Sequence, residues 1–224
     1  MKLDKHKIFS VLGPENLHRI QNSVEEHIFL PGENIINHGD TSDQYFIIKS
    51  GIVVVLKKML LDELEQVSVL GVGEGFGEDA IINGTKQQVT VRALEKTVVC
   101  IVPRKDFDSI LKPSFLKEVF PEDVEMDGRE SQMLLDVRMA VEFEEEHIPG
   151  ALNIPLDELN MKYSELDFSK EYYVYCLAGS RSAAAAFILS SKGYRVRNIK
   201  GGLMAWDGPL VEEIQLPNES LIPT

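Results

Sequence analysis

A cysteine between a β-prone run and an alanine-rich run is the position in this sequence best suited to covalent chemistry. Residues 172–175 are Tyr-Tyr-Val-Tyr, Cys176 follows, and a loop with Gly179 and Arg181 leads into Ala183–Ala186. Backbone N–H groups at a helix N-terminus have no partner within the helix and stabilise an anion. A cysteine at such a position has its pKa lowered from roughly 8.5 into the range of about 3.5–7.5. Because Arg181 adds a fixed cation facing the same space, the pattern predicts a nucleophilic thiolate.

The spacing of the cysteine and the arginine separates two kinds of chemistry. Cysteine-dependent phosphatases hold a tetrahedral phosphate in a Cys-x5-Arg loop, whereas Cys176 and Arg181 form a Cys-x4-Arg loop, one residue shorter. A smaller ring of N–H groups suits one extra sulfur atom on the thiolate better than a phosphoryl group. We therefore predict persulfide chemistry at Cys176. The loop residues expected to stabilise the sulfur anion are Leu177, Ala178, Gly179, Ser180 and Arg181.

Three ordered blocks of sequence around this cysteine resemble the rhodanese family. The segment Cys-x-x-Gly-x-Arg-Ser is similar to the active loop of that family. Residues 134–155 carry Leu-Leu-Asp-Val-Arg and His-Ile-Pro-Gly-Ala-Leu-Asn-Ile-Pro, and residues 201–206 carry Gly-Gly-Leu-Met-Ala-Trp. One short motif is weak evidence, but three blocks in family order over about ninety residues are specific. The resemblance implies a sulfurtransferase that carries sulfane sulfur as a cysteine persulfide, on an α/β domain with a central, mostly parallel sheet.

Four residues near the cysteine have expected supporting roles. Asp136 and Arg138 are expected to form an ion pair that holds the end of a strand. His147 is expected to be structural, because the family motif places it on a turn. Leu177 stands where many rhodaneses have a basic residue. With one cation fewer, a protein or small-molecule persulfide becomes a candidate donor beside thiosulfate.

The first half of the chain contains short β-prone runs separated by turn residues. Many such runs at near-regular spacing predict an antiparallel β-roll, jelly-roll-like, with flanking helices. We expect helices at Pro14–Val24 and Arg104–Leu111. The predicted strands are Glu26–Leu30, Ile35–Asn37, Gln44–Lys49, Ile52–Lys57, Gln66–Leu70, Gln88–Leu94 and Thr97–Val102.

Phrases within this roll resemble the cyclic nucleotide-binding domain family, from about residue 8 to residue 111. The matching segments are residues 29–40, 45–53 and 75–78, with Arg92-Ala93-Leu94 after them. The resemblance implies that a short helix after the Phe-Gly-Glu element directs its N–H groups at a cyclic phosphate. It also implies that the glutamate accepts a hydrogen bond from the ribose 2′-OH. The candidate pocket residues are Gly77, Glu78, Asp79, Ala80, Gln87 and Gln88.

The arginine that pairs with the cyclic phosphate in that family is replaced here. An ungapped alignment places Gln87 at its position, and glutamine has neither the charge nor the bidentate fork of arginine. Lys86 is adjacent, but neighbouring side chains on a strand point to opposite faces. cAMP and cGMP remain candidate ligands. Glu78 is interpreted either as a ribose ligand or as a residue that only caps the short helix.

No long closing helix is expected after the roll. Leu111-Lys112-Pro113-Ser114 interrupts the helical pattern, because proline disfavours helix in the residue before it. Residues 115–120 predict a short helix at best before an acidic junction. The first domain is therefore also a candidate docking or dimerising module, and a homodimer is one expected assembly.

Length and composition predict two domains, at residues 1–115 and 116–224, with the core of the second at about 122–210. The net charge of −13 opposes a nucleic-acid partner. Two cysteines are too few for a secreted disulfide framework. The N-terminus does not resemble a signal peptide, and no run approaches the roughly 20 apolar residues that span a bilayer. We therefore expect a soluble cytoplasmic protein that does not act at a membrane.

Other residues are assigned to structure rather than chemistry. Cys100 lies in an apolar run and is expected in the core, and Trp206 is expected to pack against the second domain. The acidic run Glu142–Glu146 is interpreted as a solvated helix face or a surface for a partner. The five histidines have no metal-ligand spacing, so no metal site is expected.

The combined prediction is a rhodanese-type thiosulfate or persulfide sulfurtransferase that requires no cofactor. It would act between a small sulfur donor and a thiol or cyanide-like acceptor, with an N-terminal regulatory or docking domain. Two other classes stay open: a non-enzymatic cyclic-nucleotide or partner sensor that uses the rhodanese fold as an interaction module, and a phosphatase of rhodanese-like fold. The intact Cys176 opposes the first, and the short Cys-x4-Arg loop opposes the second.

Overall fold

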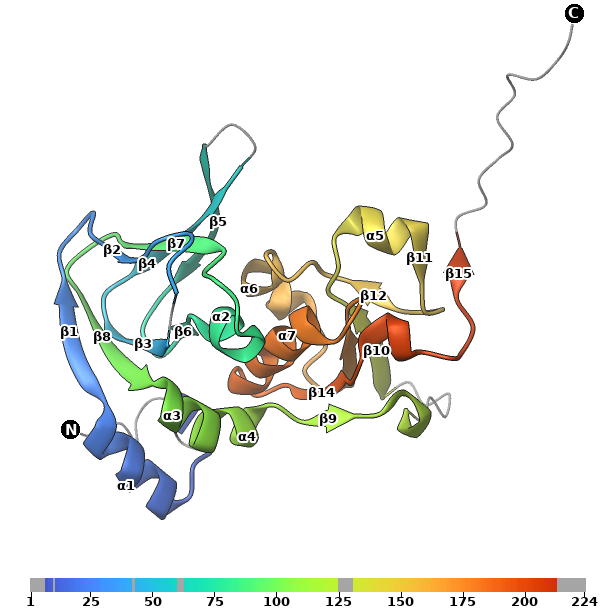
Figure 1. Ribbon diagram of the computed structural model, residues 1–224, viewed down its shortest axis with the longest axis horizontal. Coiled ribbons are helices and arrows are strands. Elements are labelled where there is room, and N and C mark those ends of the chain that lie inside the picture. Colours follow the sequence, from blue (N-terminus) through green and yellow to red (C-terminus); the bar gives the residue numbers. More distant parts are fainter. Residues whose placement is uncertain (1–6, 10, 42, 60–62, 125–130, 213–224) are drawn as a thin grey trace, which may run out of the picture.

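Two sheet-based units make up the chain. The computed structural model describes residues 7–9, 11–41, 43–59, 63–124 and 131–212. Figure 1 shows an antiparallel roll on one side and a parallel sheet on the other, with helices α2 (Glu78–Asn83) and α7 (Ser180–Ser191) between them. This arrangement confirms the predicted α+β roll followed by an α/β unit.

The N-terminal unit is a roll of two four-stranded sheets, and every strand pair in it is antiparallel. Apolar side chains from the facing sheets form its core, including Phe46, Phe76 and Val91. Each predicted strand lies within about two residues of an observed one. One sheet has the order β1 (Glu25–Phe29), β8 (Thr97–Pro103), β3 (Gln44–Ser50) and β6 (Gly75–Phe76); the other has the order β2 (Asn34–Ile36), β7 (Val89–Ala93), β4 (Val53–Lys58) and β5 (Leu64–Leu70).

Helical segments precede and interrupt the roll. A short turn, η2 (Lys7–Phe9), is followed by α1 (Pro14–Ser23), which begins at Pro14 as its sequence predicts. Ile20 is the buried residue of α1 and joins a second apolar cluster, which the helices form with strands β3 and β8. A single residue, Gly77 in the left-handed conformation, separates β6 from helix α2.

The helical segment after the roll continues through Pro113, so the predicted interruption at Leu111 is wrong. α3 (Arg104–Asp106), the π-helical turn η3 (Phe107–Leu111) and α4 (Lys112–Phe115) are continuous. A π turn widens the backbone, so a residue without an N–H can enter the helix without breaking it. The Ser114 hydroxyl donates to the carbonyl of Ile110, one turn earlier, at 2.7 Å.

After α4 the chain crosses to the second sheet. The prediction of a short helix at residues 115–120 is therefore wrong. Leu116 has extended backbone and ends α4. β9 (Glu118–Val119) pairs in parallel with β14 (Arg195–Ile199), so this segment forms an edge strand of the second unit. A short turn, η4 (Pro121–Asp123), follows it.

The C-terminal unit contains a five-stranded sheet in which every pair is parallel. Its order is β12 (Leu152–Asn153), β10 (Gln132–Asp136), β13 (Glu171–Tyr175), β14 and β9. A two-stranded antiparallel ribbon joins β11 (Glu146–His147) to β15 (Val211–Glu212). The remaining helical segments are α5 (Ala140–Glu145), α6 (Leu159–Lys162), η5 (Tyr163–Glu165), α7 and η6 (Gly202–Ala205).

Helix α7 belongs to both units. Its alanines pack against the parallel sheet, and its Phe187 enters the apolar cluster that the helices of the first unit form with strands β3 and β8. The Phe187 ring contacts the rings of Tyr45, Phe107 and Phe115, with centroids 5.6, 5.1 and 5.6 Å away. At the C-terminal end of α7, the Lys192 ammonium lies 2.6 Å from Glu74 of the roll.

Among the described residues, none of the helices has the length and apolar character needed to cross a bilayer.

Candidate active site at the Cys176 loop

Cys176 lies at the carboxyl end of β13, at the start of the loop that opens into α7. Tyr172–Tyr175 form a buried strand because their bulky side chains pack on both faces of the sheet. The sulfur accepts a hydrogen bond from the N–H of Gly179 at 3.2 Å, and the Ser182 hydroxyl lies 3.5 Å from it. The thiol therefore lies against donors at the N-terminal end of a 12-residue helix, an arrangement that stabilises a sulfur anion.

The five predicted loop residues surround this sulfur unevenly. Cys176 is buried, at 1 % exposed, and Gly179 is buried with it. Leu177, Ala178 and Ser180 are exposed and form the outer rim of the loop. The Gly179 N–H therefore faces the sulfur, whereas Leu177, Ala178 and Ser180 are exposed to solvent.

Two glycines after β14 set the shape of the loop. Gly202 has a φ of +59°, and a Cβ there would lie 2.2 Å from the carbonyl oxygen of Cys176. Leu203 N–H donates to that same oxygen at 2.8 Å, and Met204 N–H donates to the carbonyl of Leu177 at 2.9 Å. The Gly-Gly-x-x-x-Trp segment thus holds the cysteine loop in place through backbone hydrogen bonds and close backbone packing.

Arg181 differs from its expected role as a free cation facing the sulfur. Its guanidinium forms a bidentate pair with the carboxylate of Glu142 on α5, at 2.6 and 2.7 Å. Hydrogen bonding to Arg181 lowers the pKa of Glu142 to about 2. The arginine charge is therefore compensated, because a carboxylate within reach satisfies the guanidinium fork.

Glu142 is the site residue that the sequence did not reveal. Of the two interpretations of the acidic run, a solvated helix face or a surface for a partner, the first is wrong for Glu142, whose side chain is 29 % exposed and paired. Its second role is local, since its carboxylate accepts from the Met139 N–H at 3.0 Å and caps the start of α5. The sequence carries only half of the capping-box pattern, because the glutamate is at the third helical position but Met139 stands where Ser or Thr is typical.

Asp136 and Arg138 form a buried bidentate pair beside the loop. The Arg138 Nη2–Asp136 Oδ2 distance is 2.7 Å, and the side chains are 3 % and 0 % exposed. The Arg138 N–H also donates to Asp136 Oδ1 at 2.9 Å, and Asn153 Nδ2 donates to both backbone carbonyls. This network fixes the end of β10, next to the end of β13.

His147 has a structural environment. Its Nδ1 lies 2.8 Å from the carbonyl oxygen of Phe143, and its ring stacks on that of Phe143 with centroids 3.9 Å apart.

Cys100 is fully buried in β8, and burial raises the pKa of its thiol to about 11. Trp206 is partly buried against the core of the C-terminal unit.

The residues predicted to form a pocket in the roll divide into two groups. Gly77, Glu78, Asp79, Gln87 and Gln88 line one cavity of about 340 Å³, whereas Ala80 is 1 % exposed and packs away from it. Gln87 is buried and the adjacent Lys86 is exposed, so Lys86 faces away from the cavity. The backbone of Gln87 is held by Asp40 and Gly39, at 2.9 and 2.8 Å.

Comparison with known proteins places both units in families. The model of the rhodanese-like domain matches residues 122–208, and that of the cyclic nucleotide-binding domain matches residues 26–114. A sulfurtransferase from Allochromatium vinosum is 36% identical over 78 residues, which cover 34% of this chain and 73% of that protein. The chain belongs to the rhodanese family.

Two further matches are reported, one for each unit. The Bacillus subtilis protein YrkF is 38% identical to the rhodanese domain over 97 residues, 43% of this chain. The chain spans only about half of YrkF, 51% of its length. A solved structure titled as cAMP-bound PfPKA-R is 30% identical over 48% of this chain and 38% of that one, with a TM-score of 0.45. The N-terminal unit matches the family model of the cyclic nucleotide-binding domain.

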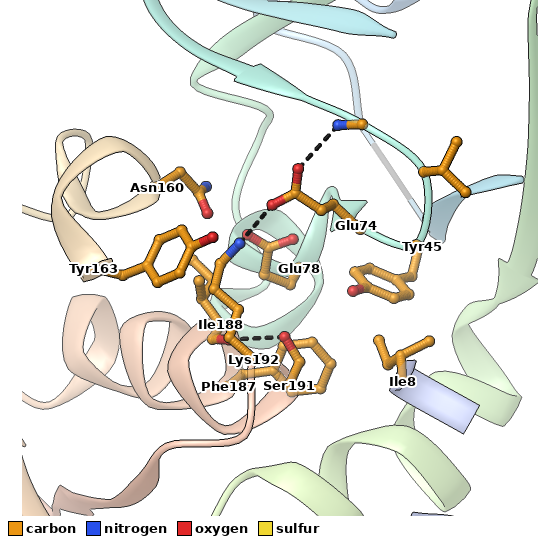
Figure 2. Close-up of a pocket in the computed structure, with 14 residues that line it drawn as sticks. Ile8, Tyr45, Glu74, Glu78, Asn160, Tyr163, Phe187, Ile188, Ser191 and Lys192 are labelled. Atoms are coloured by element: carbon orange, nitrogen blue, oxygen red, sulfur yellow. Dashed lines mark hydrogen bonds and ion pairs between the residues drawn. The ribbon is translucent and has the colours of Figure 1, made fainter. Parts of the chain in front are cut away.

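The rhodanese domain and the cyclic nucleotide-binding domain enclose a second cavity, of about 440 Å³. Figure 2 shows Glu74 and Glu78 of the nucleotide-binding domain facing Lys192, Tyr163 and Asn160 of the rhodanese domain. Burial raises the pKa of Glu78 to about 7; its own backbone N–H and Lys192 oppose the rise, whereas Asp79 adds to it. Glu78 lines both cavities, so its carboxyl group lies where the two domains meet.

Proposed function

We propose that this rhodanese-family chain is a sulfurtransferase whose Cys176 carries sulfane sulfur as a persulfide. The observation that carries the proposal is the 3.2 Å contact from the Gly179 N–H to the Cys176 sulfur at the start of α7. Donors fixed in this position stabilise the charge of both the thiolate and the terminal sulfur of the persulfide, without reorganising during the reaction.

The reaction proceeds in two displacements. The Cys176 thiolate attacks the outer sulfur of the donor and forms a sulfur–sulfur bond, while the donor's bond to that sulfur breaks. With thiosulfate, sulfite leaves with the electron pair. A nucleophilic acceptor, a thiolate or cyanide, then attacks the terminal sulfur, and Cys176 leaves as the thiolate. No net proton transfer is required when the attacking groups are ionised.

A persulfide with an apolar body is the donor class that fits the rim of the loop. Leu177 is 42 % exposed and Met204 is 74 % exposed. The hydrogen bond from Met204 N–H to the Leu177 carbonyl places the two residues together. Since Arg181 is already paired with Glu142, the rim offers apolar contact rather than an uncompensated charge for a dianion. We therefore expect a lower KM for a persulfide donor than for thiosulfate.

Replacement of Cys176 tests the assignment. Cys176→Ser should abolish sulfur transfer from both thiosulfate and a small persulfide, because serine cannot form the persulfide. Cys100→Ala is the matched control, since Cys100 is buried in the roll and should leave turnover unchanged. Mass spectrometry should find a gain of one sulfur atom on Cys176 after incubation with donor. Turnover retained in Cys176→Ser, or sulfur found on Cys100 instead, would contradict the proposal.

A further inference from the structure

A buried carboxyl group that the sulfur chemistry does not use lies where the two domains pack. Glu78 is 8 % exposed, and its Oε2 atom has no hydrogen-bond partner among the described residues. It begins α2, which packs against α7 of the rhodanese domain. Ile81 of α2 and Phe187 of α7 belong to the same apolar cluster, so the contact is largely apolar beside this acid. An unsatisfied buried polar group is rare in a native protein and requires a physical explanation.

Two carboxyl groups and one ammonium group meet at this contact (Figure 2). The Lys192 ammonium lies 2.6 Å from Glu74 and 4.2 Å from the centre of the Tyr163 ring. With a neutral Glu78, the charges of Glu74 and Lys192 balance. With an ionised Glu78, two carboxylates compete for the same ammonium, and one negative charge is left in excess.

The other titratable groups around Glu78 do not balance this charge within the part of the chain that the structure describes. Burial raises the pKa of Tyr45 well above its ordinary value, and Glu78 and Glu74 add to the rise, so this phenol stays neutral. Burial also raises the pKa of Asp79, the next residue of α2, whose carboxylate accepts from Asn83 at 2.6 Å. The cations that line the cavity of about 340 Å³ already have acidic partners, in the pairs Lys57–Asp157 and Arg181–Glu142.

The proton on Glu78 exchanges in a pH range where an ordinary glutamate is already ionised. Burial raises the pKa of Glu78 from 4.5 to about 7. Below pH 4.5 the group is neutral in the folded and the unfolded chain alike, so it imposes no penalty on folding. As the pH rises from 4.5 through about 7, the unfolded chain loses this proton first, and the folded state is progressively destabilised. The adjoining cavity of about 440 Å³ has room for the water that carries the proton.

We propose that Glu78 is a pH-sensitive switch of the contact between the two domains: its protonated carboxyl group keeps α2 packed on α7, and its ionisation loosens that contact. An excess charge in a largely apolar contact is unfavourable, and entry of water between the two helices relieves it. The proposal does not depend on sulfur transfer at Cys176, and either can fail without the other.

Thermal unfolding of the full chain at pH 5 and pH 8 tests the switch. Glu78→Gln imitates the protonated acid, so its midpoint relative to the wild type should be roughly 5 °C higher at pH 8 than at pH 5. Glu65→Gln is the matched control, because it removes the same charge from an exposed position of β5 and should show no such change with pH. A difference between Glu78→Gln and the wild type that is the same at both pH values would overturn the proposal.

Hydrogen exchange locates the change. In the wild type, the protection of backbone amides in α2 and in the last turn of α7, corrected for intrinsic exchange, should fall roughly tenfold from pH 6 to pH 8. In Glu78→Gln it should stay constant. If that variant does not fold, Glu74→Gln replaces it: without the competing carboxylate Lys192 stabilises an ionised Glu78, so protection should be lost at a lower pH than in the wild type. Protection that does not change with pH in the wild type, or that changes equally in the variant, would contradict the switch.

Discussion

At the scale of single residues, the charge of Arg181 is the feature that decides how the active site treats anions. The guanidinium is held by Glu142 in a bidentate pair, and the side chains are 34 % and 29 % exposed. The arginine charge is therefore largely cancelled, and the donors that lie against the Cys176 sulfur are the Gly179 N–H and the Ser182 hydroxyl.

Removing the charge of Glu142 should improve the use of anionic donors. In Glu142→Gln the guanidinium of Arg181 is no longer neutralised, so the KM for thiosulfate should fall roughly three- to fivefold, as expected for a partly exposed charge. The effect should shrink at high salt, because exposed charges are screened. Steady-state kinetics with thiosulfate and with a neutral persulfide donor provide the measurement.

The pH range of this effect follows from the pKa of Glu142. Its value of about 2 lies below the ordinary value of 4.5, so the pair with Arg181 is fully present above pH 4.5 and is lost only as pH falls through about 2. The wild-type and Glu142→Gln KM values should therefore differ by a constant factor from pH 5 to pH 8. Arg181→Ala serves as the control, and in that background Glu142→Gln should no longer lower the KM. A decrease that persists without Arg181 would contradict the mechanism.

At the scale of elements, the turn η6 determines the shape of the cysteine loop. Its N–H groups bind the carbonyls of Cys176 and Leu177, and Gly202 packs against the backbone of both. Because these are contacts of backbone with backbone, side-chain rearrangement cannot relieve a clash there. The position of the sulfur thus depends on a segment about 25 residues further along the chain.

Gly202→Ala should destabilise the protein and abolish sulfur transfer. The new Cβ would lie 2.2 Å from the Cys176 oxygen, at a residue with φ of +59°. Overpacking and left-handed backbone together should lower the free energy of unfolding by roughly 3 kcal/mol. Chemical denaturation and a persulfide assay give the two readouts.

Gly150→Ala is the matched control for this substitution. Gly150 also has a positive φ, +76°, but no atom lies within 4 Å of a Cβ built there. It should cost only about 1–2 kcal/mol, the conformational part alone, and should keep sulfur transfer. Equal losses in the two variants would show that the contact with the cysteine loop is unimportant.

At the scale of the whole molecule, helix α7 ties the sulfur site to the roll. Its N-terminus carries the loop of Cys176, its middle places Phe187 among the rings of Tyr45 and Phe107, and its end pairs Lys192 with Glu74. A core shared in this way makes the two domains unfold together, because neither buries Phe187 alone.

Phe187→Ala should separate the unfolding of the two domains. We expect a loss of about 3–5 kcal/mol from the cavity left among the aromatic rings, and a single calorimetric transition that becomes two. Phe168→Ala is the control, since Phe168 is 58 % exposed and its ring contacts that of Tyr194 in the rhodanese domain. One sharp transition in both variants would contradict the shared core.

Local segments of the sequence determined the two-unit architecture, the seven predicted strands of the roll and the position of Cys176. Periodicity, turn residues and the ordered blocks act over short stretches of chain, so a pattern at Tyr172–Tyr175 followed by Gly179 suffices to predict a strand, a loop and a helix. The predicted interruption at Leu111–Ser114 is wrong, because the π turn that lets the helix continue depends on packing that no local rule contains.

The tertiary structure alone decided which residues meet. Glu142 and Arg181 are 39 residues apart in sequence, and Phe187 lies in one domain while its ring partners lie in the other. The cavity between the domains needs Gln87 and Leu156 on opposite walls, which no segment of sequence specifies. Local propensity fixes elements because it depends on neighbouring residues, whereas charge compensation and shared cavities depend on distances that exist only once the two domains have packed.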